Sequence, residues 1–277
     1  MAVVLGAVQG VAEFLPISSS GHLSLLQYFF GMEEPDALYN ILLHFATLAA
    51  VCAVYWRAVA DMILEFFRGI AAIFSRREGQ GRPPEGRRLV LLVIVGTLPL
   101  FAVLPFDDAV ESLGANPAFV SVMLLVTGSI LFLSDRYGGG RKNARTATVK
   151  DVLLVGAAQG FATIPGLSRS GTTISAGTAL GFDRNFAVRY SFLMSLPAVF
   201  GATLLKVVKV MKAGTLDIEL LPMYLTGMVV AGVVGYGSIR LVKLLADKGK
   251  FGWFAWYCWL AGAVSLIAGF LYTPAGT

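Results

Sequence analysis

Two short segments of this sequence hold the residues whose types and spacing could carry out chemistry. The first, residues 5–22, contains Glu13, Ser19 and His22, and the second, residues 155–172, contains Arg169. A carboxylate or an imidazole can accept a proton and a hydroxyl can act as a nucleophile, whereas a guanidinium binds an anion through parallel hydrogen bonds. The four residues therefore predict a site that binds an anion and presents a base and a nucleophile to it.

The two segments are copies of one another. A shift of 150 residues aligns LGAVQGVAEFLPISSSGH with VGAAQGFATIPGLSRSGT without a gap, and eight of the eighteen positions are identical. The shared residues are Gly, Ala, Gln and Ser, and Q-G at one end with S-x-S-G at the other argues against chance. The copies differ where chemistry is expected, with Thr163, Arg169 and Thr172 in the second at the positions of Glu13, Ser19 and His22 in the first.

Arg169 lies in the run P-G-L-S-R-S-G-T-T at 165–173, which is rich in glycine and hydroxyl groups. We expect this run to begin a helix, and a helix N-terminus beside a guanidinium suits a phosphate. The alternative is an arginine that extends toward the membrane surface beside a helix cap. The residues expected to bind the phosphate are Arg169, Ser168, Ser170, Gly171, Thr172, Thr173 and Ser18.

Glu13 lies four residues after Gln9, so both side chains project from one face of the expected helix. A carboxylate beside a neutral amide can hold a hard cation or act as a base. The alternative is an ion pair between Glu13 and Arg169, which also keeps Glu13 in the site. For His22 we favour chemistry, because a nucleophilic serine or water needs a base. His44, in the middle of an apolar run with no motif around it, is interpreted as structural.

The elements that must position these residues lie in lipid. Of the 277 residues 56% are hydrophobic and 14% are charged, and the mean hydropathy is +0.73, too apolar for a soluble domain of this length. The net charge of +5 does not indicate nucleic acid, since the basic residues lie in loops beside apolar runs. Cys52 and Cys258 are interpreted as small buried residues, and Trp253, Trp256 and Trp259 as interfacial anchors.

Six apolar runs are long enough to cross a membrane as helices, near 38–56, 88–105, 117–134, 186–208, 222–244 and 253–273. The runs 2–15 and 151–164 are too short to cross and are expected to form re-entrant helix hairpins. The predicted fold is therefore an all-α polytopic membrane protein with six full transmembrane helices and two re-entrant hairpins.

Three full spans separate the two copies, and an odd number of crossings inverts the second copy relative to the first. The hairpins should then enter the membrane from opposite faces and meet at their polar turns, as in an inverted-topology repeat. We expect one membrane domain over 1–277, with repeats of approximately 1–134 and 151–273 joined by the basic loop 135–150.

Loop charges predict the orientation of the chain. The loop 135–150 and the residues that follow an expected interfacial helix at 59–75 are rich in Arg and Lys, which assigns them to the cytoplasm. Loops 31–37 and 107–111 are acidic and should be external. One observation disagrees, because three basic residues fall on the predicted outer side: Lys206, Lys209 and Lys212.

The patterns Q-G-x-x-E-F-L-P-x-S-S-S-G-H at 9–22 and P-G-x-S-R-S-G-T-T at 165–173 resemble the signatures of the undecaprenyl pyrophosphate phosphatases, also called bacitracin-resistance proteins. Both patterns are long and specific, and their order and surroundings cover essentially the whole chain. The resemblance implies an enzyme that removes the terminal phosphate of the C55 lipid pyrophosphate and regenerates the monophosphate carrier for peptidoglycan synthesis. It also implies a multi-pass protein of the bacterial cytoplasmic (inner) membrane, with its site open to the outer side.

The same resemblance implies roles for individual residues. Glu13 is the essential acidic residue, Ser19 and His22 supply the nucleophile or the base, and Arg169 binds the pyrophosphate. The activity depends on a divalent cation such as Mg²⁺ or Ca²⁺. The family's first acidic position is Glu or Gln, and here it is Gln9. The cation would then be held by Glu13 and Gln9 together with the substrate's own phosphates.

The alternative from another class is a secondary transporter or lipid flippase, since inverted repeats with polar turns in mid-membrane are typical of transporters. The set of reactive residues distinguishes the two, because anion transport needs an arginine and helix ends but neither a base nor a nucleophile. A purely structural scaffold leaves Arg169 at membrane depth unexplained. The sequence leaves open whether serine or water attacks, which polyprenol length is preferred, and whether the chain forms a homodimer.

Overall fold

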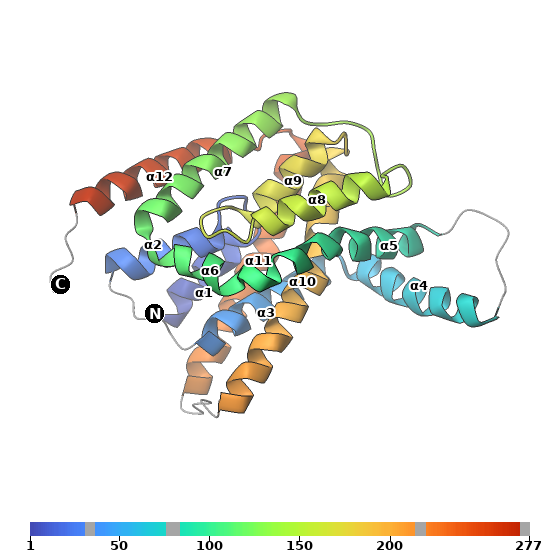
Figure 1. The fold of residues 1–277 in the computed structure, drawn as a ribbon, viewed down its shortest axis with the longest axis horizontal. Helices are drawn as coiled ribbons and strands as arrows, with labels where there is room; N and C mark the ends of the chain where they lie inside the picture. The colour runs from blue at the N-terminus through green and yellow to red at the C-terminus, as the bar shows by residue number, and fades with distance from the viewer. Residues whose placement is uncertain (31–36, 76–83, 214–219, 272–277) are drawn as a thin grey trace.

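The computed structural model describes residues 1–30, 37–75, 84–213 and 220–271, and within them the regular structure is helical (Figure 1). Lys142 and Phe182 form one isolated bridge between extended segments. The all-α prediction is confirmed. The helices are α1 Ala2–Ala12, α2 Ser19–Phe30, α3 Ala37–Val54, α4 Trp56–Ser75, α5 Glu85–Thr97, α6 Asp107–Ser112, α7 Pro117–Tyr137, α8 Val149–Phe161, α9 Arg169–Ala179, α10 Arg184–Ala213, α11 Leu221–Asp247 and α12 Gly252–Leu271.

Five helical stretches in the described ranges are long and apolar enough to cross a membrane: 85–110, 117–137, 184–212, 221–247 and 252–271. The predicted first span, 38–56, corresponds to α3, which meets α4 at a bend of 90°, and the number of spans rises to six when this bent pair counts as one span. The chain is therefore a polytopic membrane protein. The acidic loop 31–37 and the basic residues at 76–83 fall largely outside the described residues.

Helix α4 has the character expected of the interfacial helix at 59–75. Its apolar side chains Leu64 and Phe67 are exposed, whereas Glu65 on the opposite side is 4% exposed. Glu65 pairs with Arg68 at 2.9 Å and with Arg87 of α5 at 3.2 Å. These contacts hold α4 beside the start of α5, and the two helices extend together from the rest of the molecule (Figure 1).

Helices α1 and α8, with 11 and 13 residues, are too short to cross a membrane. They pack backbone to backbone on α11 and on α5, which begins the helical stretch 85–110. A Cβ atom on Gly6 of α1 would lie 2.6 Å from the carbonyl oxygen of Gly227 in α11. A Cβ atom on Gly156, the matching position of α8, would collide with the carbonyl of Gly96 in α5. The shared glycines of the two copies thus permit the same kind of close approach in both.

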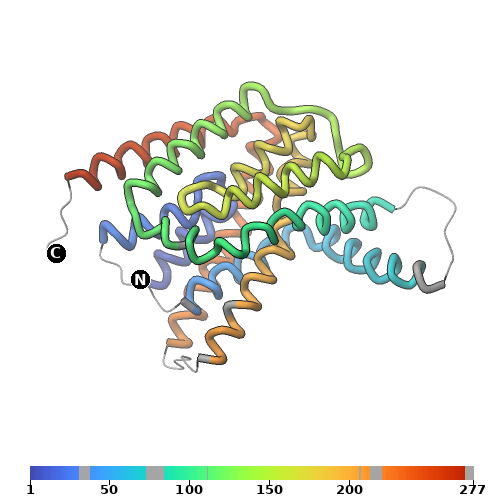
Figure 2. Tube along the Cα trace, viewed as in Figure 1, coloured from blue at the N-terminus to red at the C-terminus, as the bar shows by residue number. Residues whose placement is uncertain are grey.

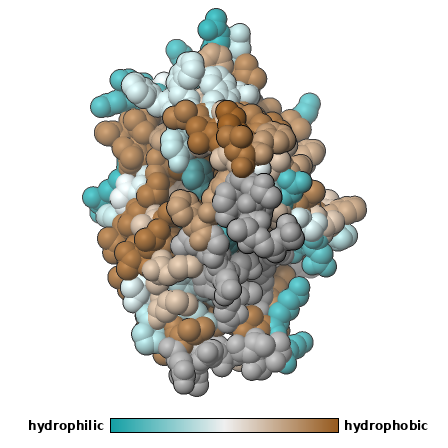
Figure 3. Space-filling view, turned by 90° about the vertical axis from the view of Figure 1, so that its left-hand side faces the viewer, coloured by the Kyte–Doolittle hydropathy of each residue, from teal (hydrophilic) through white to brown (hydrophobic). Residues whose placement is uncertain are grey.

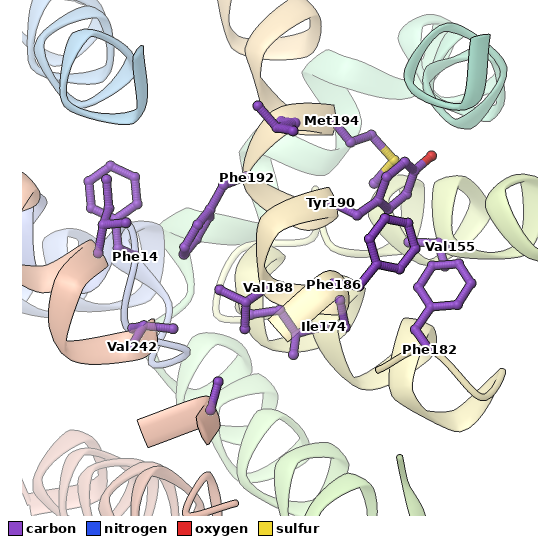
Figure 4. Close-up of a cluster of buried hydrophobic side chains, with 14 of the residues drawn as sticks. Phe14, Val155, Ile174, Phe182, Phe186, Val188, Tyr190, Phe192, Met194 and Val242 are labelled. Atoms are coloured by element: carbon purple, nitrogen blue, oxygen red, sulfur yellow. The ribbon is translucent and has the colours of Figure 1, made fainter. Parts of the chain in front are cut away.

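A buried aromatic cluster anchors the turn after α1 (Figure 4). The ring of Phe14 packs edge to face on Phe192 of α10, with ring centres 5.5 Å apart. On the other side of α10, Tyr190 packs against Phe182 and Phe186 at 6.0 and 5.8 Å. The cluster ties the turn that follows α1 and the loop that follows α9 to the same long helix, so both hairpins have a common support.

Helices α7 and α12 lie side by side along one edge of the molecule (Figure 1). Ser121 and Ser265 share a hydrogen bond of 2.8 Å between them, and the indole of Trp259 packs on Gly128 and donates to the carbonyl of Leu125. The predicted tryptophan anchors are therefore divided. Trp259 is held against α7, whereas its neighbours in the sequence at 253 and 256 are 72% and 65% exposed.

The outer surface suits lipid. Figure 3 shows one side of the molecule, on which apolar side chains cover wide areas between hydrophilic groups. Helix α10 has 30 residues and is about 45 Å long at 1.5 Å per residue, longer than the hydrocarbon core. Its last turns, with Lys209 and Lys212, can therefore extend into water, and the disagreement between these lysines and the predicted orientation stands. The side chain of Lys206 lies outside the described part.

Candidate active site

The turns of the two hairpins meet inside the bundle, and their traces can be followed in Figure 2. A Cβ atom on Gly21 of α2 would lie 3.1 Å from the Cα of Gly166, and one on Gly171 of α9 would lie 3.2 Å from the Cβ of Pro16. Each hairpin thus presses the start of its second helix against the turn of the other. The glycines at these positions let two polar turns approach within van der Waals contact.

The second helix of each hairpin is capped in the same way. The hydroxyl of Ser18 accepts a hydrogen bond of 3.1 Å from the backbone of Gly21, and the hydroxyl of Ser168 accepts one of 3.1 Å from Gly171. The backbones differ, because Ser18 has a φ of +70° whereas Ser168 has −78°. A positive φ is uncommon outside glycine and tends to occur at functional sites, and here it precedes Ser19.

Glu13 is the centre of a buried polar cluster. One carboxylate oxygen, Oε2, accepts hydrogen bonds from the hydroxyl of Ser19 at 2.8 Å and from the amide of Gln9 at 3.1 Å, and Oε1 pairs with the guanidinium of Arg169. The side chain of Glu13 is 5% exposed. The structure therefore joins the reactive residues of the first copy to the arginine of the second, in the ion pair considered as the alternative for Glu13.

His44 of α3 belongs to the same cluster, although its place in an apolar run without a motif predicts a structural residue. Its Nδ1 lies 3.0 Å from the Gln9 amide nitrogen and 3.6 Å from Glu13 Oε2. Since the Gln9 amide N–H donates, Nδ1 is the acceptor and the neutral ring carries its proton on Nε2. No sequence signal identified this residue, because its partners are about 30 positions away and no motif surrounds it.

His22 faces away from Glu13 toward α12. Its Nδ1 is 2.8 Å from the carbonyl oxygen of Ser18, so this nitrogen donates, and its Nε2 is 2.7 Å from the hydroxyl of Tyr257. The two rings are stacked with centres 5.6 Å apart. His22 lies one turn after Ser19 on α2, so it stays near the site, and the catalytic role expected for it remains a prediction.

The start of α9 presents donors that have no partner. Arg169 Nη1 and the hydroxyl of Thr172 are buried and make no hydrogen bond to any described residue. Around them, the hydroxyl oxygens of Ser168 and Ser170 lie 3.3 Å apart, and the hydroxyl of Thr173 shares a hydrogen bond of 2.6 Å with that of Ser191 in α10. Together with the first N–H groups of the helix, these donors make a site that suits an anionic oxygen group.

Few groups are available to hold a metal ion. Within the described ranges no cluster of three or more His, Cys, Asp or Glu residues could bind one. Gln9 Oε1, however, is a buried oxygen without a partner, and it lies on the side chain that bonds to Glu13. Mg²⁺ is commonly held by one or two protein oxygens together with the phosphates of a substrate. The oxygens of Gln9 and Glu13 are of the kind that could hold such a cation together with a substrate phosphate.

The fold and this site define a polytopic membrane protein with a polar centre between two helical hairpins, where buried donors suit an anion. The family model described as bacitracin resistance protein BacA matches residues 2–264. The match covers nearly the whole chain, so the chain belongs to this family.

Three relatives named undecaprenyl-diphosphatase resemble the chain over most of their length. The protein of Desulfatibacillum aliphaticivorans is 40% identical over 273 residues, which is 97% of this chain and 98% of the relative. The protein of Desulfosudis oleivorans is 40% identical over 269 residues, which is 96% of this chain and 97% of the relative. That of Methanosphaera stadtmanae is 40% identical over 250 residues, with 87% of each covered.

Proposed function

We propose that this chain is an integral membrane phosphatase that hydrolyses undecaprenyl pyrophosphate to the monophosphate and inorganic phosphate. The contact between the Ser19 hydroxyl and the Glu13 carboxylate, beside unpartnered donors at Arg169 and Thr172, is the observation that carries the proposal. A hydroxyl that already donates to a carboxylate is prepared to lose its proton, and the adjacent donors suit a phosphate. The names of the relatives support this substrate.

In the proposed reaction the pyrophosphate oxygens take over the guanidinium of Arg169 from Glu13, which frees the carboxylate to accept a proton. Ser19, or a water in its place, transfers that proton to Glu13 and attacks the terminal phosphorus. The bridging P–O bond breaks, and the lipid monophosphate leaves. On the serine route a water then hydrolyses the phosphoserine and releases inorganic phosphate.

Two further groups complete the proposed site. A divalent cation, Mg²⁺ or Ca²⁺, held by Gln9 and Glu13 would neutralise charge on the pyrophosphate. His22, with Nε2 on the hydroxyl of Tyr257, is the group that we assign to proton transfer with the departing lipid phosphate. The isoprenoid tail would lie in lipid beside the helices.

We further propose that the six spans and two hairpins form an inverted-topology repeat in the bacterial inner membrane, with the site open to the outer side. The packing of α1 on α11 and of α8 on α5 supports the repeat, because each hairpin contacts a helix of the other half. In this position the enzyme would recycle the lipid carrier for peptidoglycan and cell-wall biogenesis and would confer resistance to bacitracin.

Phosphate release from a polyprenyl pyrophosphate by the detergent-purified protein tests the function. Arg169→Ala and Glu13→Ala should each lower the rate at least about a hundredfold, the usual loss when a group that stabilises the transition state is removed. Arg136→Ala, which removes an exposed arginine from the end of α7, is the matched control and should keep a near-normal rate. Near-normal release by either site variant would contradict the assignment.

A secondary transporter or lipid flippase on the same repeat is the other candidate. The purified protein would then bind the lipid pyrophosphate without releasing phosphate, because transport breaks no bond. The Ser19–Glu13 contact favours hydrolysis, since a transporter has no need of a nucleophile beside a base.

A further inference from the structure

A second polar cleft lies at the bend between α3 and α4. It has a volume of about 570 Å³, and its lining includes Tyr55, Arg57, Glu85, Arg189 and Lys243. These residues come from the bend, α4, α5, α10 and α11, so the cleft is a meeting point of several helices. None of them belongs to the cluster around Glu13, and the proposed reaction does not use the cleft.

Tyr55, one of the residues that line the cleft, has a buried hydroxyl without a partner among the described residues. Tyr55 is 8% exposed, and its phenol oxygen makes no hydrogen bond to any described residue. A buried hydroxyl without a partner is unfavourable, and such groups are rare in native structures unless a ligand or water completes them. The ammonium of Lys243 lies 5.2 Å from the centre of the same ring, so a ligand that accepted from the hydroxyl would also meet a cation.

The charges around Tyr55 favour an anion. Three cations, Arg57, Arg189 and Lys243, line the cleft with two carboxylates, Asp61 and Glu85. Only Arg189 has a carboxylate partner among the described residues, Glu85 at 3.2 Å. Arg57 instead lies over the ring of its neighbour at 56, and its N–H groups donate to no residue that the structure describes.

Helix α4 adds backbone donors to this set. It begins at position 56 after the 90° bend and has 20 residues, and its first residues line the cleft. The first N–H groups of a helix lack partners within the helix and carry partial positive charge. Hydroxyl, guanidinium, ammonium and helix N-terminus therefore converge in one place, a combination that suits a phosphate group.

The surroundings of the cleft indicate that the phosphate belongs to a lipid. Helix α4 is perpendicular to α3 and exposes apolar side chains, with Trp56 61%, Leu64 55% and Phe67 63% exposed. A helix with this pattern lies in the membrane interface, at the depth of the lipid headgroups. We propose that the cleft binds the phosphate of an anionic phospholipid, whose acyl chains pack on the apolar face of α4.

Thermal unfolding of the full chain in a neutral detergent tests this site. Phosphatidylglycerol is added to the micelles, and the unfolding midpoint is recorded against the lipid fraction, with phosphatidylcholine and inorganic phosphate in parallel. We expect phosphatidylglycerol to raise the midpoint and the other two to have little effect, because a ligand that binds only the folded state stabilises it.

Variants locate the effect. Tyr55→Phe removes only the unpartnered hydroxyl and should raise the lipid fraction for a half-maximal shift about tenfold, as the loss of one hydrogen bond to a charged group predicts. The double variant R57A/K243A should raise this lipid fraction further, whereas Glu85→Gln, which releases Arg189, should lower the fraction. Arg136→Ala removes a basic residue outside the cleft and is the matched control, so it should leave the fraction unchanged.

Three results would overturn the proposal or part of it. An unchanged response in both Tyr55→Phe and R57A/K243A would exclude the cleft as the binding site. An equal loss in Arg136→Ala would mean that the lipid binds by general attraction to positive charge. An equal response to inorganic phosphate would exclude the lipid and leave a free phosphate ion as the ligand. Phosphate release from the pyrophosphate substrate is a separate measurement, so failure here does not count against the proposed reaction.

Discussion

At the scale of single residues, Glu13 organises the site. It ends α1, and its partners Gln9, Ser19, His44 and Arg169 come from α1, α2, α3 and α9. A buried carboxylate is costly unless it is paired and hydrogen-bonded, and this one has both kinds of partner. The pairing that stabilises Glu13 also occupies Arg169, and in the proposed reaction the phosphate of the substrate separates the two.

Replacing Ser19 by alanine separates the two routes of attack. With serine as the nucleophile we expect phosphate release to fall at least about a thousandfold, because covalent catalysis is lost. Rapid quenching of the unmodified enzyme should also trap a phosphoserine at position 19. A loss of only about tenfold, the size expected for one missing hydrogen bond to Glu13, would assign the attack to water.

His44 is expected to act by positioning Gln9. Its Nδ1 accepts from the Gln9 amide nitrogen and so fixes the orientation of the amide, whose Oε1 is buried without a partner among the described residues. His44→Ala should lower phosphate release about tenfold, whereas His44→Asn, whose oxygen can take the place of Nδ1, should recover most of it. Unfolding midpoints should be similar for both variants. Equal phosphate release by His44→Ala and His44→Asn would show that a hydrogen-bond acceptor at position 44 does not contribute to the activity.

At the scale of helices, glycine positions decide which elements can approach. Gly6→Ala should lower the free energy of unfolding by about 1–3 kcal/mol, the usual cost of overpacking, because the added Cβ meets the backbone of α11 at 2.6 Å. Gly237→Ala on α11 is the control, since nothing lies within 4 Å of its added Cβ, and it should be neutral or stabilising. Denaturant unfolding in mixed micelles measures both, and equal stability would refute the close packing of α1 on α11.

The start of α8 should make stability depend on pH. Burial works to raise the pKa of Asp151, but hydrogen bonds from Thr148 and Lys142 outweigh it and hold that pKa below its usual value. The ionised carboxylate therefore stabilises the fold above the pKa of the unfolded chain, about 4. This contribution is lost as the pH falls below that value through the folded pKa. The unfolding midpoint is measured from pH 6 down to pH 3, about two units above to about one unit below that pKa. As the pH falls, the midpoint should drop more steeply for the natural protein than for Asp151→Asn.

At the scale of the whole molecule, each of the two hairpins packs against the other half of the chain. Each lies on a helix of the other half, α1 on α11 and α8 on α5, and both are tied to α10 by buried aromatic rings. Neither half can therefore complete a polar centre alone. The proposed division of roles, with reactive groups on one turn and hydrogen-bond donors for the phosphate on the other, depends on this arrangement.

Labelling from one side of the membrane tests the proposed orientation. In a chain whose native cysteines at 52 and 258 are replaced by alanine, a cysteine at exposed Ser112 should react in intact cells with a reagent that cannot cross the membrane. A cysteine at exposed Asn143 should react only after permeabilisation, because α7 separates the two positions. The reverse pattern would place the site on the cytoplasmic side.

The sequence by itself determined the features that depend on local composition and repetition. The apolar runs predicted a helical membrane protein, since lipid leaves the backbone few other choices. The short runs 2–15 and 151–164 predicted two hairpins, and the divergent positions of the repeat identified Glu13, Ser19 and Arg169 as one site, which the structure brings into contact.

Only the tertiary structure decided which distant side chains meet. His44 joins Glu13 and His22 turns to Tyr257 because of how α3 and α12 pack, and neither contact leaves a trace in the spacing of residues along the chain. The 90° bend after α3 and the cleft beside it likewise arise where several helices converge. Periodicity reports the environment along one helix, whereas a site is made by contacts between helices, and those depend on packing that no single segment encodes.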